Sequence, residues 1–171
     1  MPTWREEVDF LDDAGFDFEE LNEVLKKENM LFLFKLHPFT KLKKISLDEI
    51  NTYSNLTVMD TEMDIYPILP FTDCLITDYS SIYYDYLLCK EKEIYLYPFD
   101  YDNYVSNNRD LAFDYSTHMP GLHLKNFDDL LNVLKYSDHT FLEDQKKIKE
   151  EYFSENSQNS VKQLCKFIEG I

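Results

Sequence analysis

One stretch of this sequence, residues 72–81, strongly constrains how the chain can fold. Its short apolar run, Cys74–Ile76, is typical of a buried parallel strand, and Ser80 and Ser81 follow after a polar turn. Residues 82–88 then read as a helix. A strand, a tight polar turn and a helix form the place where α/β proteins hold phosphates, because a helix start offers free N–H groups and a partial positive charge to an anion. The two serines therefore have two roles open, which are capping the helix and donating to a phosphate.

Strand and helix signals alternate along the rest of the chain. Further strands are expected at residues 30–36, 56–59 and 93–97, and further helices at 18–27, 47–53, 65–69, 127–136, 141–153 and 161–168. Ser46 is expected to cap the helix that begins at Leu47. The order implies one domain over residues 1–171, with a Rossmann-like parallel sheet flanked by helices. Residues 98–121 are expected to form a long connection, with Gly121 at a turn of positive φ.

Composition excludes several classes of function. The net charge of −16 argues against nucleic acid as a partner, since such binders usually carry a basic patch. The 3 cysteines have no metal-ligand spacing, so we expect reduced thiols, a cytoplasmic protein, no metal and no cofactor. No signal peptide is visible, and no apolar run approaches the roughly 20 residues that span a bilayer.

Two further residues are candidates for a phosphate site. His37 ends the apolar run 30–36, and ligands gather at the carboxyl ends of strands in open α/β sheets. A lone histidine there more often caps or packs. Arg109 lies in the long connection, where its planar guanidinium could bind a phosphate through two hydrogen bonds or pair with Asp110.

Several linked motifs resemble the CDP-glycerol glycerophosphotransferases, the family of teichoic acid primases and polymerases. The segments that carry the resemblance are Met1–Arg5, Lys35–Pro38, Leu75–Ser81, Tyr84–Tyr86, Tyr97–Asp100, Arg109 and Phe113–Gly121. The resemblance extends from Met1 to about Ile168, in the family's order and at sensible spacing.

The resemblance implies the carboxyl-terminal lobe of a two-lobed GT-B transferase, which binds the nucleotide-diphosphate donor. Such enzymes move glycerol phosphate from CDP-glycerol to a hydroxyl of a lipid-linked teichoic-acid-type acceptor and release CMP. The full-length protein would work in the cytoplasm, with peripheral association at the inner face of the cell membrane. Two alternatives stay open: a lobe for another CDP-polyol such as CDP-ribitol, and a noncatalytic binding domain with the same fold.

The resemblance also implies residue roles, by motif. His37 is the expected catalytic residue, which contacts the donor phosphate or assists proton transfer. The expected phosphate-binding residues are Ser80, Ser81 and Arg109, and the expected supporting residues are Lys35, Thr77 and Asp78, of which Asp78 orients its turn.

The sequence departs from the family pattern in two places. Met1 falls on a Pro-Thr-Trp-Arg segment that normally lies mid-chain, so the amino-terminal lobe is expected to be absent and the fragment alone inactive. The family often has an Asp-Gly pair near the final helix, where this sequence has Asn156–Ser160. A nucleotide contact at that point is therefore in doubt.

Overall fold

Helix α2 (Phe18–Lys27) begins and ends where local signals place it. The side chain of Asp17 accepts a hydrogen bond of 2.9 Å from the backbone N–H of Glu20, which caps the first turn. Lys26 and Lys27 lie in the last turn, where a cation is favoured by the helix dipole. The bounds match the predicted helix.

The computed structural model describes residues 1–3, 10–40, 42, 45–89, 92–107, 111, 113–153 and 159–170. Its strands are β1 (Phe32–Phe34), β2 (Leu56–Val58), β3 (Cys74–Thr77), β4 (Glu93–Leu96) and β5 (Leu122–His123). Its helices are α1 (Phe10–Asp13), α2, α3 (Leu47–Ile50), α4 (Ile82–Tyr86), α5 (Tyr101–Asn107), α6 (Tyr115–His118), α7 (Phe127–Lys135), α8 (Leu142–Tyr152) and α9 (Ser160–Glu169), with a 3₁₀ turn, η1, at Leu69–Phe71.

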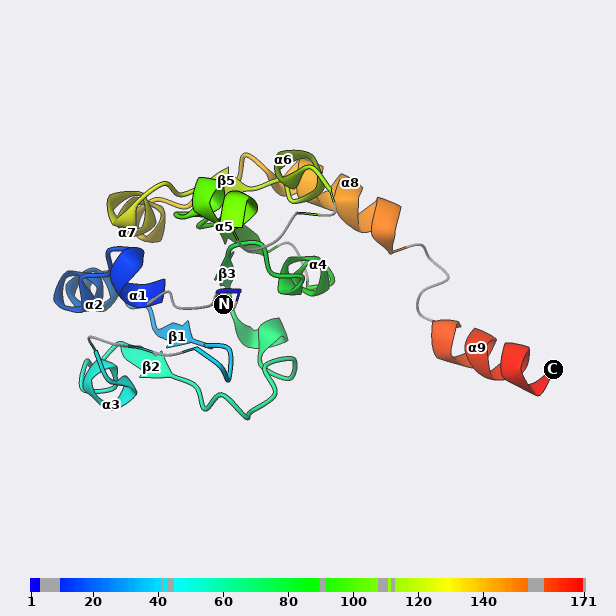
Figure 1. Ribbon diagram of the computed structural model, residues 1–171, viewed down its shortest axis with the longest axis horizontal. Coiled ribbons are helices and arrows are strands. Elements are labelled where there is room, and N and C mark those ends of the chain that lie inside the picture. Colours follow the sequence, from blue (N-terminus) through cyan, green and yellow to red (C-terminus); the bar gives the residue numbers. More distant parts are fainter. Residues whose placement is uncertain are drawn as a thin grey trace.

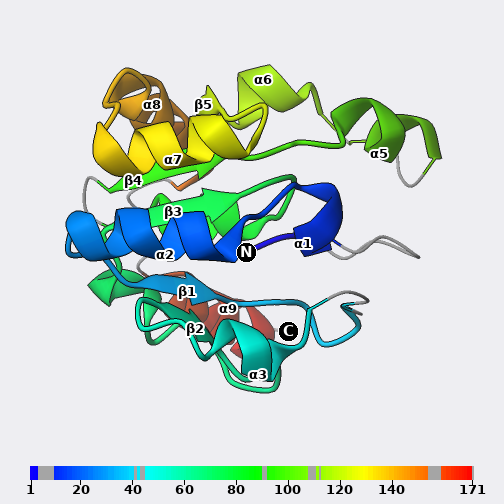
Figure 2. The ribbon, with the colours of Figure 1, turned by 90° about the vertical axis from the view of Figure 1, so that its left-hand side faces the viewer.

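The strands are parallel but fall into two separate sheets. β1 pairs with β2, and β3, β4 and β5 form the second sheet in that order. β1 and β3 run in the same direction (Figure 2), so their carboxyl ends lie at the same edge of the molecule. The expected α/β fold of parallel strands flanked by helices is confirmed, although its sheet is divided.

Helices cover both faces of the strands (Figure 1). α2 and α7 lie on one face, and α4 and α8 lie on the other. Strand β4 packs against both layers, because successive side chains point to opposite faces. Tyr95 joins the core beneath α2 and α7, whereas Ile94 and Leu96 join the core beneath α4 and α8.

Three expectations were wrong. The segment 65–69, expected to be an α-helix, consists of turns that lead into η1 at Leu69, because Pro67 and Pro70 supply no backbone N–H for a continued helix. The connection 98–121 contains α5 and α6 rather than irregular chain alone. Gly121 does not have positive φ. A Cβ there would lie 3.0 Å from Cγ of Leu96, so close packing is what excludes a larger residue.

Helix α3 has a simple local explanation. The side chain of Ser46 accepts a hydrogen bond of 3.1 Å from the backbone N–H of Glu49, so the predicted cap of α3 is confirmed. Helix α9 lies apart from the other elements (Figure 1), and none of its side chains is buried. Among the described helices, none is both long and apolar enough to cross a membrane.

Candidate functional site

The candidate site lies at the edge where β1, β3 and β4 end. The chain after β1 carries His37, and the turn after β3 carries Ser80 and Ser81. Because β1 and β3 run in the same direction (Figure 2), the two segments leave the strands on the same side of the molecule. The fold therefore brings two of the sequence-predicted segments to one edge.

Asp78 fixes the turn after β3. Its side chain is 1% exposed, and its two carboxylate oxygens accept hydrogen bonds of 2.9 Å each from the backbone N–H of Thr3. The hydroxyl of Thr3 donates a third bond of 2.7 Å. The Tyr115 hydroxyl donates to the Asp78 carbonyl at 3.1 Å. These buried contacts suit a carboxylate that orients the turn rather than one that attacks a substrate.

Thr77 reinforces the same attachment. Its hydroxyl donates a bond of 2.7 Å to the carbonyl of Met1, and its own carbonyl accepts from Tyr97 N–H at 2.7 Å. The segment Met1–Thr3 is thereby tied to the carboxyl end of β3.

Ser80 and Ser81 place polar groups in the turn after β3, at or near the surface. Ser81 is exposed and precedes α4, but its side chain makes no capping hydrogen bond. The alternative that Ser81 acts as a cap is therefore wrong. Ser80 is half-buried, and its carbonyl accepts a bond of 3.1 Å from Tyr83 N–H. Helix α4 has only 5 residues, so its dipole is short and the hydroxyls matter more for any anion.

His37 is held at the surface by its own backbone neighbours. Its Nδ1 accepts a hydrogen bond of 3.2 Å from Phe39 N–H, and the two rings lie 5.4 Å apart. A nitrogen that accepts this bond carries no proton, so in the neutral ring the proton is on Nε2. This arrangement suits Nε2 as a hydrogen-bond donor.

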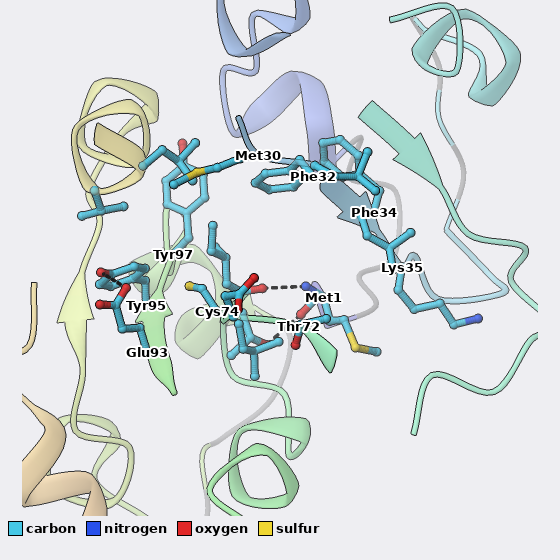
Figure 3. Close-up of a pocket in the computed structure, with 18 of the residues that line it drawn as sticks. Met1, Met30, Phe32, Phe34, Lys35, Thr72, Cys74, Glu93, Tyr95 and Tyr97 are labelled. Carbon is cyan, nitrogen blue, oxygen red and sulfur yellow. Dashed lines mark hydrogen bonds between the residues drawn. The ribbon is translucent and has the colours of Figure 1, made fainter. Parts of the chain in front are cut away.

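Lys35 does not face the same way. Its ammonium donates to the carbonyls of Asp60 at 2.9 Å and Thr61 at 2.7 Å. Figure 3 shows the side chain directed away from the pocket between β1 and β3. Lys35 therefore anchors the chain after β2.

Arg109 lies outside the described residues, as do Trp4, Arg5 and most of the segment 156–160. Among the residues that are described, no group of three His, Cys, Asp or Glu side chains is arranged to hold a metal ion.

Comparison with known proteins decides the family. The family model described as CDP-glycerol:poly(glycerophosphate) glycerophosphotransferase matches residues 1–170. The chain belongs to this family. The teichoic acid ribitol-phosphate polymerase TarL of Staphylococcus aureus (strain NCTC 8325 / PS 47) is 37% identical over 123 residues, which are 72% of this chain and 21% of that protein. The teichoic acid glycerol-phosphate transferase of the same strain is 31% identical over 144 residues, which are 81% of this chain and 35% of that protein.

Solved structures of the family share the fold. A variant of the wall teichoic acid polymerase TagF has a TM-score of 0.72 and 21% identity, over 99% of this chain and 42% of the TagF chain. Another TagF structure, obtained after a soak with CDPG, has a TM-score of 0.67 and 24% identity, over 99% and 41% of the two chains. This chain thus spans about a fifth to two fifths of the length of these family members.

A cluster of tyrosines at the same edge was missed by sequence reasoning. The rings of Tyr79 and Tyr104 stack at 4.2 Å, and Tyr115 lies 5.2 Å from Tyr79 and 5.6 Å from Tyr101. A cavity of about 690 Å³ adjoins them, lined by residues 98–103, 115, 116 and 123–125. The signal available was the pair of family segments Tyr97–Asp100 and Phe113–Gly121, to which no binding role was assigned from the sequence.

His123 lies beside this cavity and contacts the tyrosine cluster. Its ring is 5.2 Å from that of Tyr115, and burial lowers the pKa of the His123 imidazole below its ordinary value of 6.5. The His123 imidazole, which lines this cavity, is therefore uncharged at neutral pH. The cavity thus combines the aromatic rings of Tyr101 and Tyr115 with charged side chains, since Asp100, Asp102 and Lys125 also line it.

Proposed function

We propose that this chain is the donor-binding lobe of a transferase of this family. The enzyme would move polyol phosphate from CDP-glycerol, or a related CDP-polyol, to a hydroxyl of a lipid-linked teichoic-acid-type acceptor and release CMP. The observation that carries the proposal is that the chain segments after β1 and after β3, which hold His37 and the Ser80–Ser81 turn, leave the strands at the same edge (Figure 2), in a chain matched by the family model over residues 1–170.

The proposed reaction sets the demands on the site. The acceptor oxygen bonds to the phosphorus that carries the polyol, and the bond from that phosphorus to the bridging oxygen breaks. CMP leaves with that electron pair, and the hydroxyl proton passes to a base. Such transfer is catalysed by alignment and by donors that stabilise the phosphate oxygens. Ser80, Ser81 and Arg109 are the proposed donors, while Lys35, Thr77 and Asp78 support the two segments.

The contact of His37 with Phe39 favours one of the two roles open to it. As a base, Nε2 would have to be unprotonated in the neutral ring, which places the proton on Nδ1. The observed bond from Phe39 N–H to Nδ1 requires the opposite tautomer. We therefore assign His37 to the donor phosphate, with Nε2–H as the contacting group.

The polyol is either glycerol or ribitol. The family description names glycerophosphate. Ribitol has support of its own, since the ribitol-phosphate polymerases TarL and TarK are 37% and 34% identical to this chain. Both donors contain cytidine diphosphate, so the turn at Ser80 would serve either one. Competition between CDP-glycerol and CDP-ribitol for the same site decides between them.

The other lobe belongs to the same proposal. The chain covers 21% to 35% of TarL and the glycerol-phosphate transferase, so the acceptor site would lie on residues outside this sequence. The 171-residue chain alone should bind donor but transfer nothing. The lipid-linked acceptor would place the complete enzyme at the inner face of the cell membrane.

Calorimetry on the 171-residue chain tests the proposal. CDP-glycerol, CDP-ribitol and CMP should bind, and ADP should not compete with them. His37→Ala should weaken the binding of both CDP compounds. His139→Ala is a matched control, because His139 lies at the opposite edge beside Glu93, 2.8 Å from its carboxylate. Absence of binding for all CDP compounds would contradict the proposal. Binding that survives both His37→Ala and Ser81→Ala would favour a noncatalytic domain.

A further inference from the structure

The cavity of about 690 Å³ beside the tyrosine cluster has a size typical of small-molecule sites. It is lined by the residues that follow β4, by the end of β5 with the residues after it, and by the start of α6. Figure 2 shows α5, which follows β4, at the edge where β3 and β4 end. Neighbouring strands of a sheet lie about 5 Å apart, so the cavity adjoins the Ser80–Ser81 turn after β3.

Tyr79 joins this cavity to the turn after β3. It precedes Ser80, and its hydroxyl donates a hydrogen bond of 3.2 Å to Oδ1 of Asp100, which lines the cavity. Tyr115, which also lines the cavity, donates from its hydroxyl to the carbonyl of Asp78 at 3.1 Å. A ligand with a phosphate on this turn would therefore reach the cavity with a neighbouring part of the same molecule.

The polar groups of the cavity suit hydroxyls better than a phosphate. Asp100 and Asp102 contribute carboxylates, Lys125 contributes an ammonium, and His123 is uncharged at neutral pH. An anion placed among these groups would meet a net negative charge. A hydroxyl both donates and accepts hydrogen bonds, so it can bond to a carboxylate and to an ammonium.

Asp102 is the carboxylate that is better placed to bind a ligand. It is exposed in the first turn of α5, and among the described residues its side chain has no hydrogen-bond or ion-pair partner. Asp100, by contrast, already accepts the bond from Tyr79. Lys125 is also exposed, and it lines the same cavity from the chain after β5.

The ring of Tyr115 is a poor platform for a nucleobase. A base stacks on an open ring face, but Tyr115 is only 5% exposed. Its ring already packs against those of Tyr79, Tyr101 and His123, at 5.2, 5.6 and 5.2 Å. Tyr115 therefore serves as a packed wall of the cavity.

We propose that this cavity binds the polyol of the CDP-polyol donor, with Asp102 accepting a hydrogen bond from a polyol hydroxyl and Lys125 donating one. The inference rests on the proposed function, because it assigns to the cavity the group that the reaction would transfer. The phosphates would lie on the turn after β3, with the nucleoside on their other side. Ribitol phosphate has more free hydroxyls than glycerol phosphate, so the cavity should favour ribitol.

Calorimetry with CMP, CDP, CDP-glycerol and CDP-ribitol tests this on the parent chain and on Asp102→Asn. The substitution should weaken CDP-glycerol about fivefold, and CDP-ribitol at least as much, because a charged acceptor is lost. CMP and CDP should bind at least as tightly as before, since removal of a negative charge favours phosphates. Asp48→Asn is the matched control, because Asp48 is an exposed carboxylate in the first turn of α3 and does not line the cavity.

The outcomes separate this inference from the proposed function. Equal weakening of CMP and CDP-glycerol by Asp102→Asn would place the nucleoside in the cavity, and undiminished binding of both polyol compounds would remove the polyol from it. Either result would overturn the inference while donor binding stands. Absence of binding for all four ligands to the parent chain would overturn the proposed function and the inference together.

Amide chemical shifts give a second measurement that needs no substitution. The shift differences between the chain saturated with CDP and the chain saturated with CDP-glycerol should be concentrated at residues 100–103 and 123–125. Differences confined to other residues would overturn the inference. Free glycerol phosphate added to the CDP-glycerol complex should leave these amides unchanged. Saturable shifts there would assign the cavity to the polyol of the acceptor, which would also overturn it.

Discussion

The segments after β1 and after β3 reach the same edge of the molecule, but they are built differently. Asp78, just before the Ser80–Ser81 turn, is 1% exposed and accepts three hydrogen bonds from Thr3. His37, by contrast, is exposed and set by a bond to Phe39, two residues along. A buried network fixes the first segment, and a local contact sets the second. Substitution of Asp78 should therefore damage the fold, whereas substitution of His37 should weaken ligand binding without damaging the fold.

The largest effect is expected at the buried network. Asp78→Ala should lower the free energy of unfolding by about 2–4 kcal/mol, because it leaves the Thr3 donors without their acceptor. Asp78→Asn keeps one acceptor oxygen and should cost less. Urea denaturation measures both variants. A loss below about 1 kcal/mol for Asp78→Ala would contradict the role given to this carboxylate.

A second large effect is a dependence of stability on pH at Met1. Burial lowers the pKa of the Met1 α-amino group from 8.0 to about 6. Between these values the unfolded chain binds more protons than the folded chain, so the free energy of unfolding should rise with pH, by up to roughly 3 kcal/mol. Below pH of about 6 this contribution should level off.

Denaturation from pH 5.5 to 8.5 measures this effect, with mass spectrometry to verify that Met1 is retained. An acetylated amino terminus is the matched control, because its amide still donates to Ile76 but does not titrate. The control should lack this contribution. The same slope in both proteins would show that another group is responsible.

A smaller and purely functional effect is expected at His37. His37→Ala should weaken CDP-glycerol binding about tenfold, equivalent to one hydrogen bond to a charged phosphate, and should change stability by less than about 0.5 kcal/mol. His37→Gln places an amide N–H near the position of Nε2 and should recover part of the affinity. If Gln and Ala were equally weak, Nε2–H would not be the contacting group.

The smallest effect is expected at Ser81. Ser81→Ala should weaken donor binding roughly three- to fivefold, because one neutral donor is lost. Its stability should stay within about 0.5 kcal/mol of the parent, since the hydroxyl makes no capping bond. Ser54→Ala is a control at an exposed serine earlier in the chain, outside the turn after β3. A loss of about 1 kcal/mol for Ser81→Ala would restore the capping role.

Local signals predicted those parts of the fold that depend on local physics. The bounds of α2 and the cap at Ser46 follow from side chains that bond within one turn. Strand β5 was missed because Leu122–His123 is too short for any periodicity. Helix α5 was missed because its residues, Tyr101–Asn107, are mostly polar and aromatic and show no apolar repeat. Tertiary packing decides both elements.

The candidate site, too, could be predicted from the sequence only in part. Motifs pointed to His37 and to the Ser80–Ser81 turn, and the direction of β1 and β3 brings them to one edge. The tyrosines around Tyr79 meet only through contacts between distant segments, which no spacing along the chain reveals. The division of the sheet was equally hidden, since each strand looks complete in its own sequence.

Amide chemical shifts during titration with CMP and then CDP-glycerol test the donor site most directly. The proposed function predicts saturable shifts at Ser80, Ser81 and His37, with little change at Glu93 and His139 on the opposite edge. Shifts confined to Glu93 and His139, or no saturable shift at all, would contradict the assignment of the donor site.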